Sequence, residues 1–235
     1  MSLAGFAASP LFGLGLTLLV YAGAKKLYGR LRFFLLHPVL VSIAFIIAAL
    51  KLLDIDYPTY MKGGSIVSFF LAPSVVALGL PLYRQLKRLA SQALPLALTT
   101  AFASAVGIVA SVAPVLILGG PREILASLAP KSVTTPIAIV VSEQVGGLPS
   151  LTAAAVVLTG VVGAVAGPVI LRLIGITEGI AFGYAMGSAS HGIGTARALE
   201  AGEVEGAASS LALCMNGIAT AVLAPWIVRL LVGSA

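Results

Sequence analysis

Charged residues are scarce in this chain. Of its 235 residues, 9% are Asp, Glu, Lys or Arg, 59% are hydrophobic, and the mean hydropathy is +1.10. Soluble domains carry about 25% charged residues. The shortage excludes an ordinary soluble domain, so we expect an all-α integral membrane protein.

Thiols, histidines and catalytic motifs are also few. Cys214 is the one cysteine, which excludes an intramolecular disulfide, and the only histidines are His37 and His191. No Gly-x-Ser-x-Gly elbow, phosphate-binding loop or His-Glu-x-x-His sequence occurs. We therefore expect a protein that is not an enzyme and holds no cofactor or metal.

The net charge of +6 comes from basic residues in short loops between apolar runs. They are not interleaved with aromatic residues, so we do not expect nucleic-acid binding. Basic loops of this kind orient a chain in the membrane and contact anionic lipid. They place the loops at 25–32 and 84–88 in the cytoplasm and the N-terminus outside. The topology of the second half stays open.

At about 20 apolar residues per span, the chain contains about eight hydrophobic segments in a single multipass domain, residues 1–235. The predicted segments are Leu3–Ala24, Phe33–Leu53, Ile66–Leu82, Ala93–Leu118, Ile124–Val141, Leu151–Ile174, Gly179–Ala198 and Ala207–Val232. The loop Asp54–Lys62 is expected outside. Proline recurs near the ends of three long segments, at 114, 168 and 225, which indicates an internal repeat with a period near 57 residues.

The fifth segment is interrupted by Pro130 and Pro136, with Lys131, Ser132, Thr134 and Thr135 between them. Proline removes a backbone donor and breaks a helix interior. A broken helix exposes backbone N–H groups, which together with a lysine and hydroxyls favour a small carboxylate. The alternative is a kinked helix whose lysine reaches the membrane surface.

The seventh segment is interrupted by a polar stretch from Ser188 to Arg197. We single out Ser190, His191, Gly192, Gly194, Thr195 and Arg197 as further substrate-binding candidates. Histidine titrates near neutral pH, so His191 is a proton-relay candidate, together with Glu143. Two alternatives stay open: His191 is a packing residue, or Arg197 pairs with an acidic neighbour such as Glu200.

These strings resemble the LrgB/CidB family of bacterial membrane proteins. The resemblance rests on Lys131-Ser-Val-Thr-Thr-Pro136, Glu143-Gln-Val-Gly-Gly147 and Ser190-His-Gly-Ile-Gly-Thr-Ala196, with support from Leu71-Ala-Pro-Ser-Val75, and runs over residues 10–232. It implies a multipass protein of the bacterial cell membrane.

The resemblance implies two functions. One is an antiholin-like protein that regulates murein hydrolase export with a small LrgA/CidA-type membrane protein. The other, from plastidial relatives, is a translocator of glycolate and glycerate. The residues favour a carrier of small carboxylates (glycolate, glycerate, pyruvate or lactate type), coupled to protons, with alternating access through the two broken helices. Membrane lipid is a further partner, and a homo-oligomer is left open.

Overall fold

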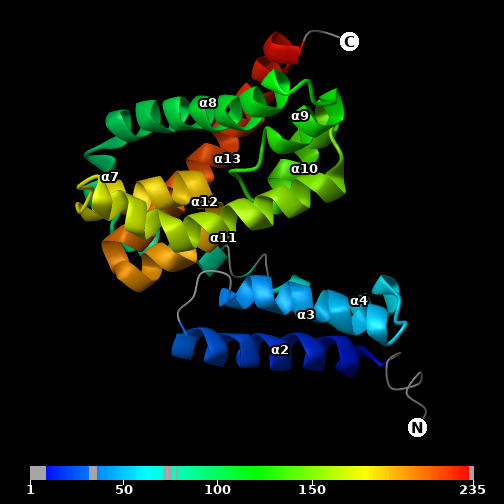
Figure 1. Cartoon of the computed structure of the whole chain (residues 1–235). Helices are drawn as coiled ribbons and strands as arrows, with labels where there is room; N and C mark the ends of the chain where they lie inside the picture. The colour runs from blue at the N-terminus through cyan, green and yellow to red at the C-terminus, as the bar shows by residue number, and fades with distance from the viewer. Residues whose placement is uncertain (1–8, 32–35, 71–72, 74–75, 78, 233–235) are drawn as a thin grey trace. The chain divides into compact units, whose positions relative to one another are not determined.

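The computed structural model describes residues 9–31, 36–70, 73, 76–77 and 79–232. Within these ranges, every regular element longer than one residue is an α-helix, which confirms the all-α prediction (Figure 1). The chain divides into two compact units, an N-terminal unit (Met1–Ala77) and a C-terminal unit (Leu78–Ala235).

The N-terminal unit consists of α2 (Pro10–Leu31), α3 (Pro38–Leu52) and α4 (Tyr57–Phe69), and α2 packs against both others. A Cβ atom built on Gly63 would lie 1.9 Å from the carbonyl oxygen of Pro10. Only a residue without a side chain lets α2 and α4 approach so closely. The hydroxyl groups of Thr17 and Tyr60, 2.8 Å apart, add a hydrogen bond across the same contact.

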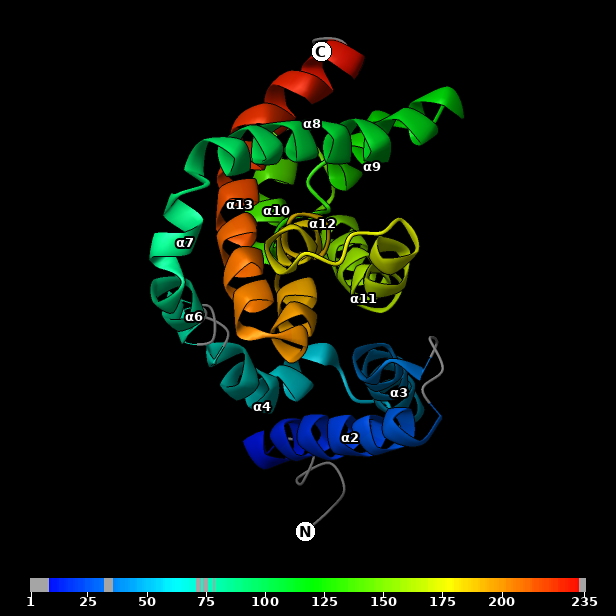
Figure 2. The same cartoon turned by 90° about the vertical axis from the view of Figure 1, so that its left-hand side faces the viewer.

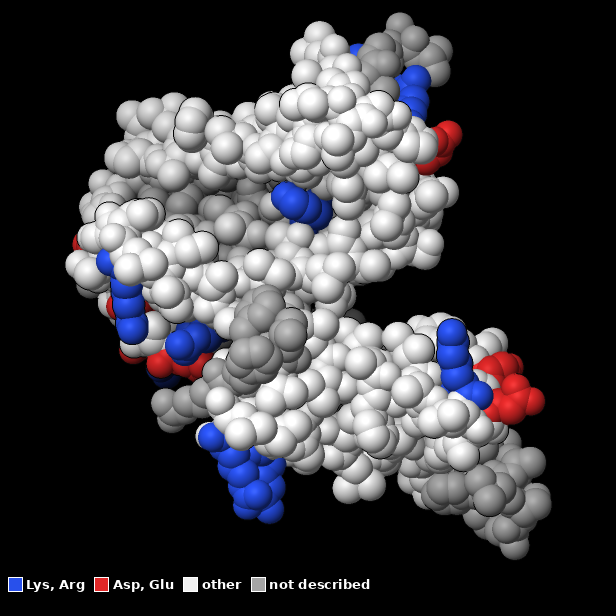
Figure 3. Space-filling view, viewed as in Figure 1, with Lys and Arg blue, Asp and Glu red and all other residues white. Residues whose placement is uncertain are grey.

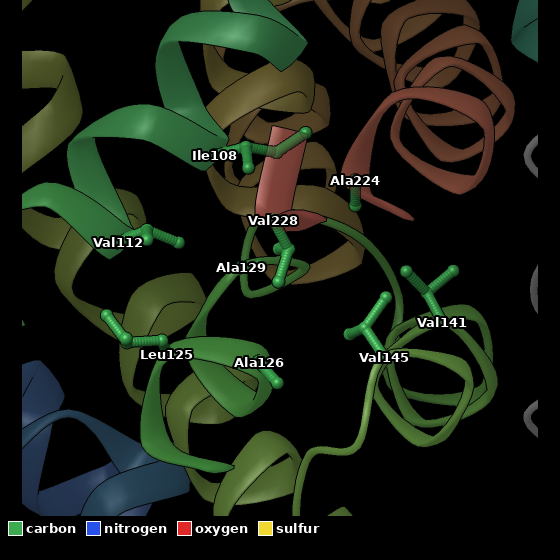
Figure 4. Packing of buried hydrophobic residues seen from close by; sticks show 9 residues of the cluster. All are labelled: Ile108, Val112, Leu125, Ala126, Ala129, Val141, Val145, Ala224 and Val228. Atoms are coloured by element: carbon green, nitrogen blue, oxygen red, sulfur yellow. The ribbon is translucent and has the colours of Figure 1, made fainter. Parts of the chain in front are cut away.

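The C-terminal unit contains the longest helices (Figures 1 and 2). Its elements are α6 (Gly79–Arg84), α7 (Leu86–Ala90), α8 (Ala93–Ile117), α9 (Arg122–Leu128), α10 (Thr135–Gln144), α11 (Pro149–Leu173), α12 (Gly179–Ala201) and α13 (Glu203–Val232). Helix α13 lies against α12 and α8, and α11 packs along α12. Apolar side chains from α8, α9, α10 and α13 form a core at one end of this unit (Figure 4).

Three of the described helices are long and apolar enough to cross a membrane, by length and composition: Ala93–Ile117, Pro149–Leu173 and Glu203–Leu231. The structure therefore supports a membrane protein but not eight crossing segments. The fifth predicted segment fails because its break leaves α9 with 7 residues and α10 with 10, far below the about 20 that a span needs.

Two more boundary predictions are wrong. Ile66–Leu82 is not one span, because α4 ends at Phe69 and α6 begins at Gly79. The expected external loop Asp54–Lys62 is helical from Tyr57 onward, since the proline at position 58 stands in the first turn of α4, where its missing N–H costs nothing. Residues 71–72, 74–75 and 78, and with them most of the string Leu71-Ala-Pro-Ser-Val75, lie outside the described residues.

The first predicted segment also differs, because α2 continues to Leu31 through basic residues assigned to a loop; its positions 3–8 lie outside the described residues. Pro114, Pro168 and Pro225 stand inside α8, α11 and α13, near the carboxyl ends. That common position does not establish the internal repeat, which stays a prediction. The single multipass domain over residues 1–235 also stays a prediction.

Both interruptions are present at the predicted places. Between α9 and α10, residues 129–134 form turns, and the amide N–H of Lys131 bonds to the carbonyl of Leu128. Helix α12 breaks at His191, whose φ of 42° and ψ of −136° are not helical. Breaks of this kind leave carbonyl groups without their helical donors, and buried carbonyls need partners.

Asn216 on α13 supplies those partners. Its Nδ2 donates to the carbonyl oxygen of Ser188, at 3.0 Å, and to that of Ser132, at 3.3 Å. Its Oδ1 accepts a hydrogen bond from Ser104 of α8, at 2.5 Å. One buried amide therefore joins both interruptions to α8 and α13.

We expect Asn216→Ala to lower the free energy of unfolding by about 1–2 kcal/mol, because two buried carbonyls lose their donor. Chemical denaturation in detergent micelles measures this. Ser210→Ala is the matched control, since the Ser210 hydroxyl bonds only to Gly206 within α13. Equal losses in the two variants would contradict the role given to Asn216.

Gly63→Ala is expected to destabilise the N-terminal unit by about 1–3 kcal/mol, because the new methyl group overlaps the α2 backbone. Gly15→Ala on α2 is the control: nothing lies within 4 Å of its Cβ position, so better helix propensity should leave stability unchanged or raised. Thermal unfolding of both variants distinguishes packing from propensity, and a neutral Gly63→Ala would refute the close contact.

Candidate functional site

A cavity of about 960 Å³ lies in the C-terminal unit. It is bounded by α8, the connection between α9 and α10, α11 and the first half of α12. Figure 3 shows a hollow bordered by uncharged residues, with a basic side chain beside it. Both polar interruptions contribute to the lining, the first through Lys131 and Ser132, the second through Ser188, Ala189 and Ser190.

Lys131 carries the positive charge of this lining. Its Nζ donates to the Ser111 hydroxyl on α8, at 3.2 Å, and Ser111 in turn donates to the carbonyl of Gly107. The ion pairs among the described residues join Arg84 to Glu203 and Arg197 to Glu200, so none compensates Lys131. The ammonium group is partly buried, and an ammonium in such a position favours an anion as its partner.

The hydroxyl of Ser188 is the second polar group that faces this cavity without a matching partner in the described residues: Lys131 lacks an ion pair, and the Ser188 hydroxyl lacks a hydrogen bond. Ser188 is 9% exposed, lines the cavity, and its Oγ atom has no hydrogen-bond partner among the residues that the structure describes. Because the carbonyl groups of Ser188 and Ser132 bond to the same Asn216 amide, both interruptions lie at one end of the cavity. Ser190 is buried beside them, its side chain set against Gly163 of α11.

His191 does not line the cavity. Its ring lies against Gly160 of α11, and Nε2 is 2.9 Å from the carbonyl oxygen of Val156. A carbonyl only accepts, so Nε2 carries the hydrogen and donates it. The ring thus holds the break of α12 against α11, which is the packing alternative left open by the sequence. Its positive φ marks a strained backbone, a feature that clusters at functional sites.

The remaining candidates are not brought into the cavity. Thr195 joins α12 to α13, since its Oγ1 donates to the His191 carbonyl and accepts from Ser209, at 2.9 Å each. Arg197 is exposed and pairs with Glu200 at 2.9 Å, as the second alternative predicts. Four further candidates lie outside the lining as well: Thr134, Thr135, Gly192 and Gly194. Glu143 is exposed near the end of α10.

Neither Asn216 nor Ser188 is among the binding candidates that the sequence predicts. The same holds for the polar residues that α8 and α11 carry in otherwise apolar runs. Those that line the cavity or contact Lys131 are Thr99, Ser111 and Thr159. Their signal was present, because a hydroxyl or amide in an apolar span needs a partner.

The similarity of this chain to known proteins shows the family to which it belongs. No solved structure matches it. The model of the LrgB-like family matches residues 17–230. YwbG of Bacillus subtilis (strain 168) is 39% identical over 90% of this chain and 94% of its own length. The antiholin-like protein LrgB of Bacillus mycoides (strain KBAB4) is 34% identical over 92% of this chain and 95% of its own length.

A Haemophilus influenzae protein (strain Rd) is 33% identical over 92% of this chain and 94% of its own length. The family model covers both polar interruptions, Asn216 and every residue that lines the cavity. The cavity and its two interruptions therefore stand in a membrane protein that belongs to the LrgB-like family.

Proposed function

We propose that this protein is a carrier of small organic carboxylates in the bacterial cell membrane. The observation that carries the proposal is the position of Lys131, a cation with no ion pair in the described part of the chain, at the end of a cavity where both broken helices meet. A carboxylate there exchanges its hydration for the ammonium group and the Ser188 hydroxyl. Glycolate, glycerate, pyruvate and lactate are the first substrates to test.

Broken helices that meet at a polar point are the arrangement secondary transporters use for substrate binding and alternating access. We extend the proposal to proton coupling, with His191 as the titrating group. Its Nε2–H is engaged with Val156, so a proton would enter on Nδ1 and place a charge at the break of α12. Glu143, exposed near the end of α10, is the other relay candidate.

A second candidate is an antiholin-like regulator of murein hydrolase export, acting with a small LrgA/CidA-type membrane protein. The comparisons support this candidate more directly than the first, since relatives 34% identical bear the name antiholin-like protein LrgB. The two candidates differ in what Lys131 does. A carrier needs its charge for every transported anion, whereas a regulator that acts through helix–helix contacts does not.

Uptake of radiolabelled glycolate and pyruvate into proteoliposomes tests the carrier. We expect saturable uptake by the wild type and at least a tenfold loss in Lys131→Met, because hydrogen bonds to charged groups contribute about 1.5–3 kcal/mol each. Lys62→Met is the matched control, since Lys62 is an exposed lysine of the N-terminal unit and its removal should leave uptake unchanged.

Absence of uptake by the wild type, alone and with an LrgA-type protein reconstituted beside it, would reject the carrier. The regulator is tested in cells that lack the chain, by measuring murein hydrolase release. If Lys131→Met restores control of that release as fully as the wild type does, the regulatory function does not depend on anion binding.

A further inference from the structure

We infer that Ser188 is the specificity-determining residue of this site. Its hydroxyl binds the oxygen on carbon 2 of the substrate while Lys131 holds the carboxylate, so the site selects 2-hydroxy and 2-oxo acids over unsubstituted acids of the same length. The inference rests on the proposed function, because it divides the binding of one small acid between these two residues.

Ser188 differs from other buried hydroxyl residues of the described helices. Thr100, Ser111 and Ser210 each donate to the carbonyl four residues earlier in their own helix, which is a common partner of a helical hydroxyl. The Ser188 Oγ atom has neither this partner nor any other among the described residues, although the residue is buried. Because Ser188 lines the cavity, the hydrogen-bonding capacity of its hydroxyl is left for a bound molecule.

The backbone places Ser188 beside the residue that follows Lys131. The carbonyl oxygens of Ser188 and Ser132 lie 3.0 and 3.3 Å from the same Nδ2 atom of Asn216, so they are at most two hydrogen-bond lengths apart. Lys131 and Ser188 also line the same cavity. In the proposed complex, one small acid contacts both residues through polar groups on neighbouring carbon atoms.

Lys131 alone supplies enough donors for the carboxylate. An ammonium group has three N–H donors, and one of them is directed to the Ser111 hydroxyl, at 3.2 Å. The remaining two match the two oxygens of a carboxylate. Ser111 itself donates to the carbonyl of Gly107, so its hydrogen is not available to the acid. Ser188, on the other interruption, is then left to bind a further oxygen of the ligand.

A serine hydroxyl suits the oxygen on carbon 2 in either oxidation state. It both donates and accepts, and it rotates to the geometry that the partner requires. It therefore donates to the carbonyl of a 2-oxo acid such as pyruvate, and accepts from the hydroxyl of a 2-hydroxy acid such as glycolate or lactate. An acid without this oxygen, such as acetate or propionate, leaves the Ser188 hydroxyl buried and unpaired.

Ligand-dependent thermal stabilisation of the purified protein in detergent measures binding independently of transport. The ligands form matched pairs, glycolate with acetate and lactate with propionate, and 3-hydroxypropionate carries the oxygen one carbon further away. We expect glycolate, lactate and pyruvate to bind about tenfold more tightly than acetate and propionate, because they gain one buried hydrogen bond. 3-Hydroxypropionate should bind like propionate.

Ser188→Ala should lower the affinity for glycolate to that for acetate and leave the binding of acetate unchanged. The variant should fold normally, since it removes a hydroxyl that has no partner in the described part of the chain. Ser210→Ala is the matched control, because Ser210 is a buried serine outside the cavity lining, and it should keep the preference. A preference for glycolate over acetate that persists in Ser188→Ala would overturn the role of Ser188.

The outcomes separate this inference from the proposed function. Equal binding of acetate and glycolate, together with uptake that requires Lys131, overturns the role of Ser188 and leaves the carrier. A preference that depends on Ser188, in a protein that takes up none of these acids, supports the role of Ser188 and rejects the carrier. Absence of binding by all of these acids overturns the inference.

Discussion

The hydrogen bonds of the Asn216 side chain hold the central part of this protein together. Two breaks in helices, about sixty residues apart in the sequence, each leave carbonyl groups without helical donors, and one amide on α13 serves a carbonyl of each. An apolar side chain at position 216 would remove this donor from both carbonyls, and a buried carbonyl that loses a partner is costly where no water can replace it. A single amide can bond to a carbonyl of each interruption only when the two interruptions lie side by side. This pairing therefore requires the interruptions to meet.

The carbonyl pairing has a consequence for the cavity. Because the breaks meet, their side chains also meet, and Lys131 and Ser188 reach the same hollow from different helices. Neither finds a charge-balancing or fully satisfying partner among the described residues. The carbonyls of Ser132 and Ser188 thus have a donor, while the Ser188 hydroxyl and the Lys131 charge lack a matching partner among the described residues, which is the condition expected of a binding site.

Local chemistry made the two breaks predictable. Pro130 and Pro136 cannot continue a helix, and the small polar residues around His191 cost free energy when they are buried in lipid. Both breaks were therefore predicted at the correct places. The long helices α8, α11 and α13 followed from apolar runs of sufficient length. The segment at 66–82 was misjudged, because hydropathy averages over a window and does not register where a helix begins or ends.

The site itself was predictable only in part. Of the predicted binding residues, Lys131, Ser132 and Ser190 line the cavity, whereas His191, Thr195 and Arg197 contribute to packing and surface pairing. Residues that follow one another along α12 point in directions about 100° apart, so a polar string on a helix cannot all face one cavity. Which residues face inward depends on where α11 and α13 pack against α12. The order of residues along α12 does not show where those helices pack.

Helix α11 receives the side chains of α12 in places that glycine leaves empty, the His191 ring at Gly160 and the Ser190 side chain at Gly163. Such interlocking transmits displacement. The break at His191 cannot slide along or rotate against α11 without the His191 ring leaving the recess at Gly160, so the two helices are coupled at this point. A movement of α12 at this break that keeps the His191 ring in its recess must therefore carry α11 with it.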